Sequence, residues 1–310
     1  MKGFRGKVSS SQLKGASHKM QKTEETPYKD DEALILIMGP SGSGKSTFIN
    51  NYAKEDIAKV THGFETCTKN IEVFAGSFPT EALPASIVED YNVPQKALLK
   101  LVDTPGFFCT NDDSQTLQKI AEWVRPPKGP PRKLAGIIYL HDMTTKHLQI
   151  ETKMSLSLFQ QICGADAASR TVLVKTQWSG DEGTRTRAAE LDGTFFKDMI
   201  KDGAVCATIK DGSDGVTEES IVHDILRKDT ANRVVLQLLR ELQEGKALQT
   251  TGAGKELTQS LILLLKGELD QRQFLIFKRA LEQLTGKTIT NPSRSQKLKG
   301  WMIRQFKLIA

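Results

Sequence analysis

The sequence contains little cysteine and no long apolar run. Its four cysteines, Cys67, Cys109, Cys163 and Cys206, are far apart in the chain, and no two of them form a C-x-x-C pair. This spacing matches no metal site and predicts reduced thiols. The first 32 residues lack the apolar core of a signal peptide, and no apolar run reaches the length of a membrane span. These absences predict a cytoplasmic protein.

Positive charge is concentrated at the two ends of the chain. The net charge of the whole sequence is +6, but residues 1–30 carry +4 and residues 287–310 carry +6, so the part between them is acidic at −4. The basic residues therefore lie in tails and not across a groove, which argues against nucleic acid as a partner. We expect a disordered basic tail at 1–30 and a basic amphipathic tail at 291–310.

A phosphate-binding loop follows the first apolar run. Residues 33–38 (ALILIM) have the pattern of a buried strand, and residues 39–47 (GPSGSGKST) match G-x-x-x-x-G-K-S/T at every defined position. Glycines let the backbone wrap around a polyphosphate, and the loop amides form an anion-binding nest at a helix N-terminus. Lys45 supplies a cation for the β- and γ-phosphates, and the Ser46 hydroxyl is placed to hold Mg²⁺. The predicted phosphate-binding residues of this loop are Gly39, Pro40, Ser41, Gly42, Ser43, Gly44, Lys45, Ser46 and Thr47.

A second motif, D-T-P-G at 103–106, lies 58 residues after Lys45 and directly follows a predicted strand at 97–102. Asp103 at a strand end can reach Mg²⁺ through water, and the amide of Gly106 can bind a γ-phosphate. The same tetrapeptide also fits an ordinary turn. Together with the phosphate loop, it predicts a switch-type nucleotide-binding domain.

Strand and helix patterns alternate along residues 31–229. Alternation at this spacing indicates an α/β fold, in which a mostly parallel sheet has helices on both faces and makes three layers. After residue 230 only helical periodicity recurs, so we expect an α-helical extension over 230–290. Further strands are expected at 71–75, 136–141, 171–176 and 204–209, and helices at 115–124, 151–163, 185–201 and 217–227.

With both motifs placed, the chain resembles the translation-factor-related class of GTPases. Within that class it is similar to the septin-like and immune-associated nucleotide-binding G domains, especially a group common in fungal genomes. The resemblance rests on residues 39–47, 62–68 (HGFETCT), 101–107 (LVDTPGF) and 136–141 (GIIYLH).

The resemblance implies a P-loop G domain at 31–229 that binds GTP or GDP with Mg²⁺. It also implies that Thr68 senses Mg²⁺ and acts with Lys45 in catalysis. The implied metal site then consists of Ser46, Thr68 and Asp103. The segment around Thr68 also fits an ordinary surface loop.

The chain departs from this class at two places. Many relatives carry a water-orienting Gln directly after D-x-x-G, where this chain has Phe107. A benzyl group cannot hold water by a hydrogen bond, so this departure predicts slow hydrolysis and an apolar anchoring role for Phe107. Guanine-specific domains carry N-K-x-D where this chain has T-Q-W-S at 176–179. The resemblance implies base contacts from Thr176, Gln177 and Trp178, although Trp178 fits ordinary packing equally well.

The leading hypothesis is a Mg²⁺-dependent GTP-binding switch with slow hydrolysis, in which a homodimer through the nucleotide face can supply missing catalytic groups. A second hypothesis is an assembly module that keeps nucleotide as a structural ligand, and a third is another phosphate-loop NTPase that uses ATP. Near the C-terminus, Leu298, Met302, Phe306 and Ile309 fall at helical spacing among basic residues. This stripe fits either weak contact with an anionic membrane or docking on the helical extension.

Overall fold

The structure is a computed structural model, and it describes residues 20–23, 32–60, 68–79, 96–108, 113–144, 150–210, 216–228, 233–267 and 271–288. Seven strands form one sheet: β1 (Met20–Thr23), β2 (Ala33–Met38), β3 (Glu72–Pro79), β4 (Lys96–Asp103), β5 (Gly136–Asp142), β6 (Thr171–Trp178) and β7 (Val205–Lys210). Their order in space is β1-β3-β4-β2-β5-β6-β7. The five strands from β4 to β7 run parallel, and β3 and β1 are antiparallel at one edge. The mostly parallel sheet predicted from the sequence is therefore confirmed.

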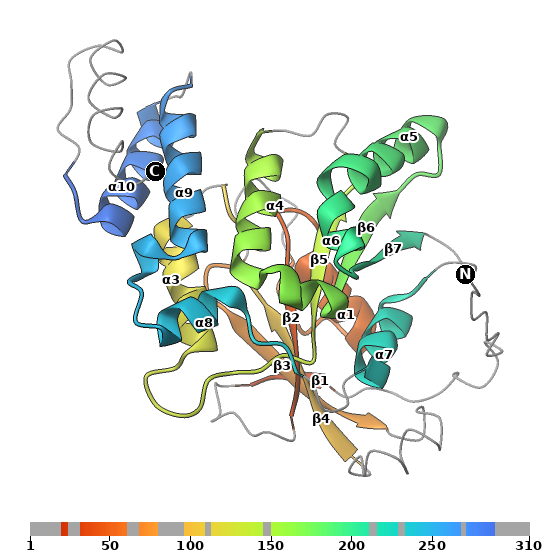
Figure 1. Ribbon diagram of the computed structural model, residues 1–310. Helices are drawn as coiled ribbons and strands as arrows, with labels where there is room; N and C mark the ends of the chain where they lie inside the picture. Colours follow the sequence, from red (N-terminus) through yellow and green to blue (C-terminus); the bar gives the residue numbers. More distant parts are fainter. Residues whose placement is uncertain are drawn as a thin grey trace.

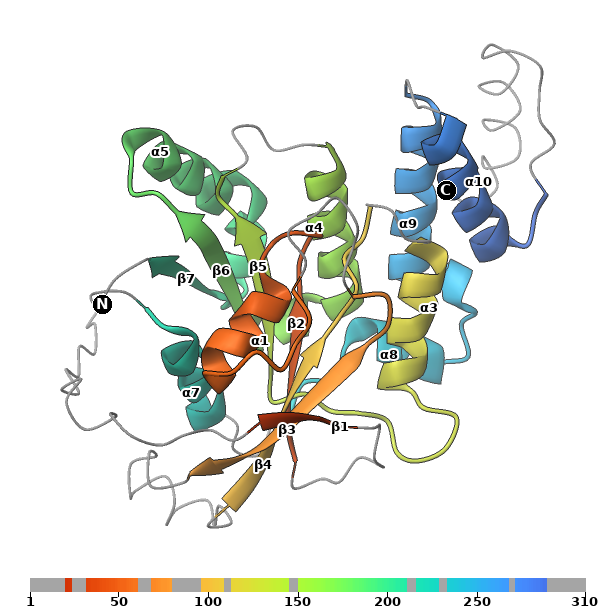
Figure 2. The ribbon, with the colours of Figure 1, turned by 180° about the vertical axis from the view of Figure 1, so that it is seen from behind.

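Helices cover both faces of the sheet, as predicted. One face packs against α1 (Lys45–Ala53) and α7 (Glu218–Lys228), which lie side by side in Figure 2. The remaining helices, of which the last two stand beside the sheet at the left of Figure 1, lie on its opposite side. These are α3 (Asp113–Val124), α4 (Ile150–Cys163), η2 (Ala165–Arg170), α5 (Glu182–Glu190), η3 (Leu191–Phe195), α6 (Lys197–Lys201), α8 (Gln237–Gln243), η4 (Leu248–Thr250), α9 (Gly252–Leu265) and α10 (Gln271–Thr285).

The central strand β2 explains why this arrangement follows from the sequence. All six of its residues are buried, because helices lie on both faces of the sheet at this point. A strand buried on both faces needs a continuous apolar run, and an alternating pattern would leave polar groups in the core. The run at 33–38 therefore identifies the centre of the sheet.

The helical C-terminal region packs directly against the rest of the chain. Leu239 of α8, Leu261 of α9 and Leu281 of α10 are fully buried, and they belong to the same hydrophobic cluster as the side chains of α3 and α4. The periodic leucines of the sequence are therefore packing residues. They join the helical extension to one face of the sheet.

Two local predictions differ from the structure. A single helix was expected over 185–201, but η3 interrupts it with one π-helical turn in which the amide of Phe196 donates to the carbonyl of Leu191 (2.8 Å). The side chains of Leu191 and Phe196 are both buried. They are five residues apart, and the wider π-helical turn places residues at this spacing on the same face of the helix.

The second difference concerns the N-terminal tail. We expected residues 1–30 to be disordered, but Met20–Thr23 form β1, which pairs with β3 and buries Met20. A four-residue strand is too short to leave a periodic signal in the sequence. Residues 1–19, 24–31 and the C-terminal tail 291–310 lie outside the described residues. Within the described part of the chain, no helix is both long and apolar enough to cross a membrane.

Candidate functional site

The predicted motifs meet at the carboxyl ends of the parallel strands. In the sheet, Ile37 of β2 is paired with Asp103 of β4, and Asp142 of β5 is paired with Thr176 of β6. The phosphate loop, the D-T-P-G motif and the segment after β6 therefore start at the same edge. In parallel α/β sheets, this edge is where ligands bind.

The backbone of the phosphate loop has the shape that its glycines allow. Gly39 has a φ of +147°, and a Cβ there would lie 2.3 Å from the carbonyl oxygen of Leu140. Gly44 has a φ of +91° and is the residue before α1, so the first amides of that helix face the loop opening. A side chain at either glycine would be strained, and the arrangement leaves an anion-binding helix N-terminus.

Lys45 lies inside the loop. Its Nζ donates to the carbonyl oxygens of Gly39 (3.0 Å) and Pro40 (2.8 Å), and its side chain is mostly buried. Ser41 and Gly42 at the loop tip are exposed. The ammonium group is therefore fixed by the loop that would hold the phosphates, next to an open rim.

The three predicted metal-site residues form one cluster. The Ser46 Oγ donates to Asp103 Oδ2 (2.8 Å), the Thr68 Oγ1 donates to the same oxygen (3.2 Å), and the two hydroxyl oxygens are 3.5 Å apart. Burial raises the pKa of Asp103, and the charge of Lys45 opposes this shift. The other carboxylate oxygen, Oδ1, is buried and has no hydrogen-bond partner among the residues that the structure describes. A buried carboxylate beside two hydroxyls is the oxygen set that Mg²⁺ prefers, so these residues fit a magnesium ion. Residues 61–67, which precede Thr68, lie outside the described part.

Gly106 lies directly against the phosphate loop. A Cβ at Gly106 would be 2.5 Å from the backbone nitrogen of Ser41, so only glycine fits here. The Thr104 hydroxyl donates to the carbonyl oxygen of Ile37 (2.8 Å), which ties the D-T-P-G motif to β2. Gly106 is thus close enough for its backbone to contact a phosphate bound in the loop.

Two phenylalanines follow Gly106, and both point into the core. Phe107 is 5% exposed and Phe108 is 6% exposed, and they pack in the cluster formed by α3 and the sheet. Phe107 therefore has the environment of the apolar anchor predicted from the sequence. The sequence reasoning missed Asp113, the first residue of α3, whose Oδ1 accepts the amide hydrogen of Phe108 (2.8 Å). An acid at a helix start was the available signal.

The three predicted base-binding residues have different environments. The Thr176 hydroxyl is directed to the carbonyl oxygens of Ser43 (3.0 Å) and His141 (3.2 Å). Thr176 therefore braces the phosphate loop against β5, a role that sequence reasoning did not foresee. Gln177 is exposed and has a φ of +55°. Trp178 is half-buried and packs against the core, so one part of its indole remains accessible.

Asp181, the first acid after this segment, is the N-cap residue of α5. Its carboxylate accepts the amide of Thr184 (2.7 Å) and the hydroxyls of Ser179 and Thr184, and it caps α5. These bonds, the one from Ser179 first, lower the pKa of Asp181 to about 2. The cap therefore uses most of the acceptor capacity of this carboxylate, which has roughly four acceptor sites, and fixes it at the start of α5.

His141, near the end of β5, is a core residue. It is 7% exposed, its ring lies edge-on to Phe196 at 6.2 Å between centroids, and burial lowers its pKa to about 4. The imidazole is therefore neutral near pH 7. Nothing in this environment makes it a catalytic base.

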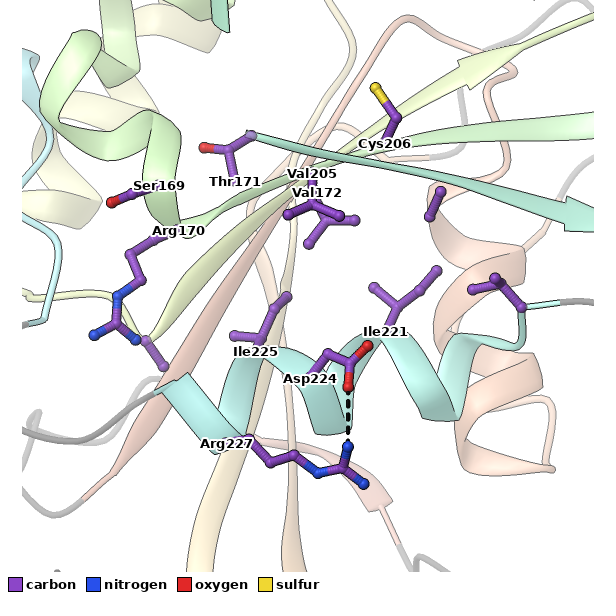
Figure 3. Close-up of a pocket in the computed structure, with 13 residues that line it drawn as sticks. Ser169, Arg170, Thr171, Val172, Val205, Cys206, Ile221, Asp224, Ile225 and Arg227 are labelled. Carbon is purple, nitrogen blue, oxygen red and sulfur yellow. Dashed lines mark hydrogen bonds and ion pairs between the residues drawn. The ribbon is translucent and has the colours of Figure 1, made fainter. Parts of the chain in front are cut away.

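A separate cavity of about 300 Å³ lies between α7 and the strands β6 and β7. Figure 3 shows Val172, Ile221 and Ile225 in its apolar wall, and an ion pair between Asp224 and Arg227 beside it (3.2 Å). It contains none of the predicted site residues. It is a gap where α7 incompletely covers the last strands, and it is not part of the phosphate site.

Comparison with known proteins agrees with this geometry. Residues 34–174 match the family model described as 50S ribosome-binding GTPase. These residues are therefore similar to a GTPase domain of that family. The matched segment contains the phosphate loop, the cluster of Ser46, Thr68 and Asp103, and the D-T-P-G motif. A search of curated proteins finds no match.

Solved structures with a similar fold include Toc33 from Arabidopsis thaliana. A dimerization-deficient mutant of Toc33 is similar at 14% sequence identity and a TM-score of 0.50, over 67% of this chain and 88% of that chain. Toc33 in complex with GDP and Mg²⁺ is similar at 15% identity and a TM-score of 0.48, over 66% and 87% of the two chains. The bacterial selenocysteine-specific elongation factor EF-Sec has 16% identity and a TM-score of 0.39, over 70% and 29%. The first similarity supports the fold described above.

Proposed function

We propose that this protein is a Mg²⁺-dependent GTP-binding switch that hydrolyses GTP slowly. The observation that carries the proposal is the cluster of Lys45, Ser46, Thr68 and Asp103 around the mouth of the phosphate loop. In this reading the G domain is of the septin-like or immune-associated type, as the resemblance of its motifs implies.

Different residues of the chain have different roles in binding and hydrolysing the nucleotide. The loop amides and Lys45 bind the β- and γ-phosphates and stabilise the charge that develops as the phosphoryl group transfers. Ser46, Thr68 and Asp103 would hold Mg²⁺, which would neutralise phosphate charge. Thr68 and the backbone at Gly106 contact the γ-phosphate and orient the attacking water.

Slow hydrolysis is the part of the proposal that depends on Phe107. Its ring is buried in the core, so it contributes no hydrogen bond to water at the position where many relatives carry Gln. A homodimer through the nucleotide face would supply such a group from the second protomer. If a dimer completes the site, the rate of GTP hydrolysis per protein molecule rises with protein concentration. If the protein is an assembly module that keeps its nucleotide, this rate does not rise.

A titration of the purified protein with GTP, GDP and ATP, with and without Mg²⁺, tests the proposal. We expect tight GTP and GDP binding that weakens when EDTA removes Mg²⁺, and single-turnover hydrolysis well below roughly 1 s⁻¹, the rate that arginine-assisted GTPases reach. Asp103→Asn should weaken the Mg²⁺ dependence while the exposed control Asp198→Asn leaves it unchanged. Equal binding with and without Mg²⁺, or a faster intrinsic rate, contradicts the proposal.

A further inference from the structure

We propose that Phe107, Phe108 and Asp113 hold Gly106 against the phosphate loop in every nucleotide state. The segment after β4 is then a fixed part of the phosphate site. The three residues act by positioning and not by touching the nucleotide. The claim that the segment stays fixed in every nucleotide state rests on the proposed function. The claim that it is held in the nucleotide-free chain does not.

The fixed contact begins at Gly106. The 2.5 Å that would separate a Cβ at Gly106 from the Ser41 nitrogen shows that the two backbones are in direct contact. On the other side, Thr104 is hydrogen-bonded to β2 and is fully buried. The motif is therefore held from both sides without a ligand.

The two phenylalanines anchor the end of the motif. Their ring centroids are 6.2 Å apart, and both rings pack among the side chains of α3, such as Leu117 and Ile120, in the main core cluster. If the segment moved away from the phosphate loop, both rings would be pulled out of this core.

Asp113 fixes the backbone of the second anchor. Phe108 has a φ of +58°, a conformation that a bulky residue rarely adopts. The fully buried Asp113 holds it there by accepting the Phe108 amide hydrogen. The next residue, Ser114, donates to Gln283 of α10 (2.9 Å), which connects this point to the C-terminal helices.

Magnitudes decide between a moving and a fixed segment. Loss of one buried Phe side chain from a core shifts an equilibrium by about 100-fold or more, so release of both rings costs a factor of about 10,000. Ligand-induced couplings between protein states are typically about 5- to 150-fold. The difference between GTP and GDP is therefore too small to release both anchors.

Amide hydrogen exchange, read by NMR at Gly106, Phe107 and Phe108, tests this inference. We expect strong protection of the Phe108 amide in the nucleotide-free protein. With GDP and with a non-hydrolysable GTP analogue, the three exchange rates should change by less than tenfold. Rapid exchange without nucleotide, or a tenfold or larger difference between the two nucleotides, overturns the proposal.

Asp113 variants separate positioning from simple stability. Asp113→Ala should speed exchange at Phe108 at least tenfold and weaken binding of the GTP analogue about tenfold more than binding of GDP. Asp113→Asn keeps an acceptor oxygen and should restore both values, and Asp198→Ala, an exposed acid in the first turn of α6, should change neither. An unchanged ratio of the two affinities in a folded Asp113→Ala protein refutes the positioning role. If Asp113→Ala does not fold, the wild-type exchange rates and the Asp113→Asn variant still decide the outcome.

Failure of the proposed function gives a different result. If wild type binds neither nucleotide, the GTP-binding proposal is wrong, while the exchange rates of the nucleotide-free chain still decide whether the segment is held.

Discussion

Replacement of Lys45 by Met tests the phosphate site most directly. The side chain keeps its length, but it loses the ammonium that donates to the Gly39 and Pro40 carbonyls. Hydrogen bonds from a charged group contribute about 1.5–3 kcal/mol each, and burial of an ammonium costs several kcal/mol in return. Because these terms oppose each other and the loop tip is open to water, we expect the free energy of unfolding without nucleotide to change by only about 1 kcal/mol.

The effect on nucleotide binding is far larger. A ligand at 100 times its Kd stabilises the folded state by about 2.7 kcal/mol, which at about 2 °C per kcal/mol raises the Tm by about 5 °C. If Lys45→Met weakens binding 100-fold, the same ligand concentration equals the Kd. The stabilisation then falls to about 0.4 kcal/mol and the Tm shift to about 1 °C.

Thermal denaturation with and without Mg²⁺-GTP measures this difference. Lys54→Met is the matched control, because it removes the same charge just after the end of α1, where Lys54 is exposed and paired with Glu219 (3.6 Å). It should keep the full nucleotide-induced shift. An equal shift in wild type and Lys45→Met would refute the assignment of the phosphate site.

The remaining predictions concern base recognition, His141 and the C-terminal tail, the last from the sequence alone. Because the carboxylate of Asp181 is engaged in the cap of α5, we expect it to contribute little to base recognition. Competition assays should then show a preference for GTP over ATP below roughly 10,000-fold, and a larger ratio would contradict this. Each charged hydrogen bond to the base that is missing removes about 1.5–3 kcal/mol of that preference. Burial disfavours the charged imidazole of His141 and lowers its pKa from the usual 6.5 to about 4. Between these two pH values the unfolded chain binds a proton that the folded chain does not, so the free energy of unfolding falls by at most about 1.4 kcal/mol per pH unit as the pH drops from 6.5 to 4. Urea titrations should show a flatter pH dependence for His141→Gln, and identical slopes would refute the assignment. The membrane interpretation of residues 291–310 predicts sedimentation with anionic liposomes at low salt that high salt or deletion of the tail abolishes, and a full-length protein that stays in the supernatant at low salt would end it.

The sequence predicted the centre of the site because its signals are local. The strand at 33–38, the glycines of the phosphate loop and Lys45 lie within a few residues of one another, and the backbone conformation of such a segment depends on its own residue types. The continuous apolar run also identified the central strand, since both faces of the sheet are covered there.

Only the tertiary structure shows which residues far apart in the sequence contact one another around the site. Thr176 braces Ser43 from 133 positions away, and Ser114 meets Gln283 across 169 positions. The burial of the two phenylalanines under α3 and the pairing of β1 with β3 depend equally on contacts between separate parts of the chain. Local patterns specify which groups can bind phosphate, because that chemistry needs particular residues in one short loop. Which of those groups can move, and which are held by the core, follows only from packing between segments whose sequences carry no signal of their meeting.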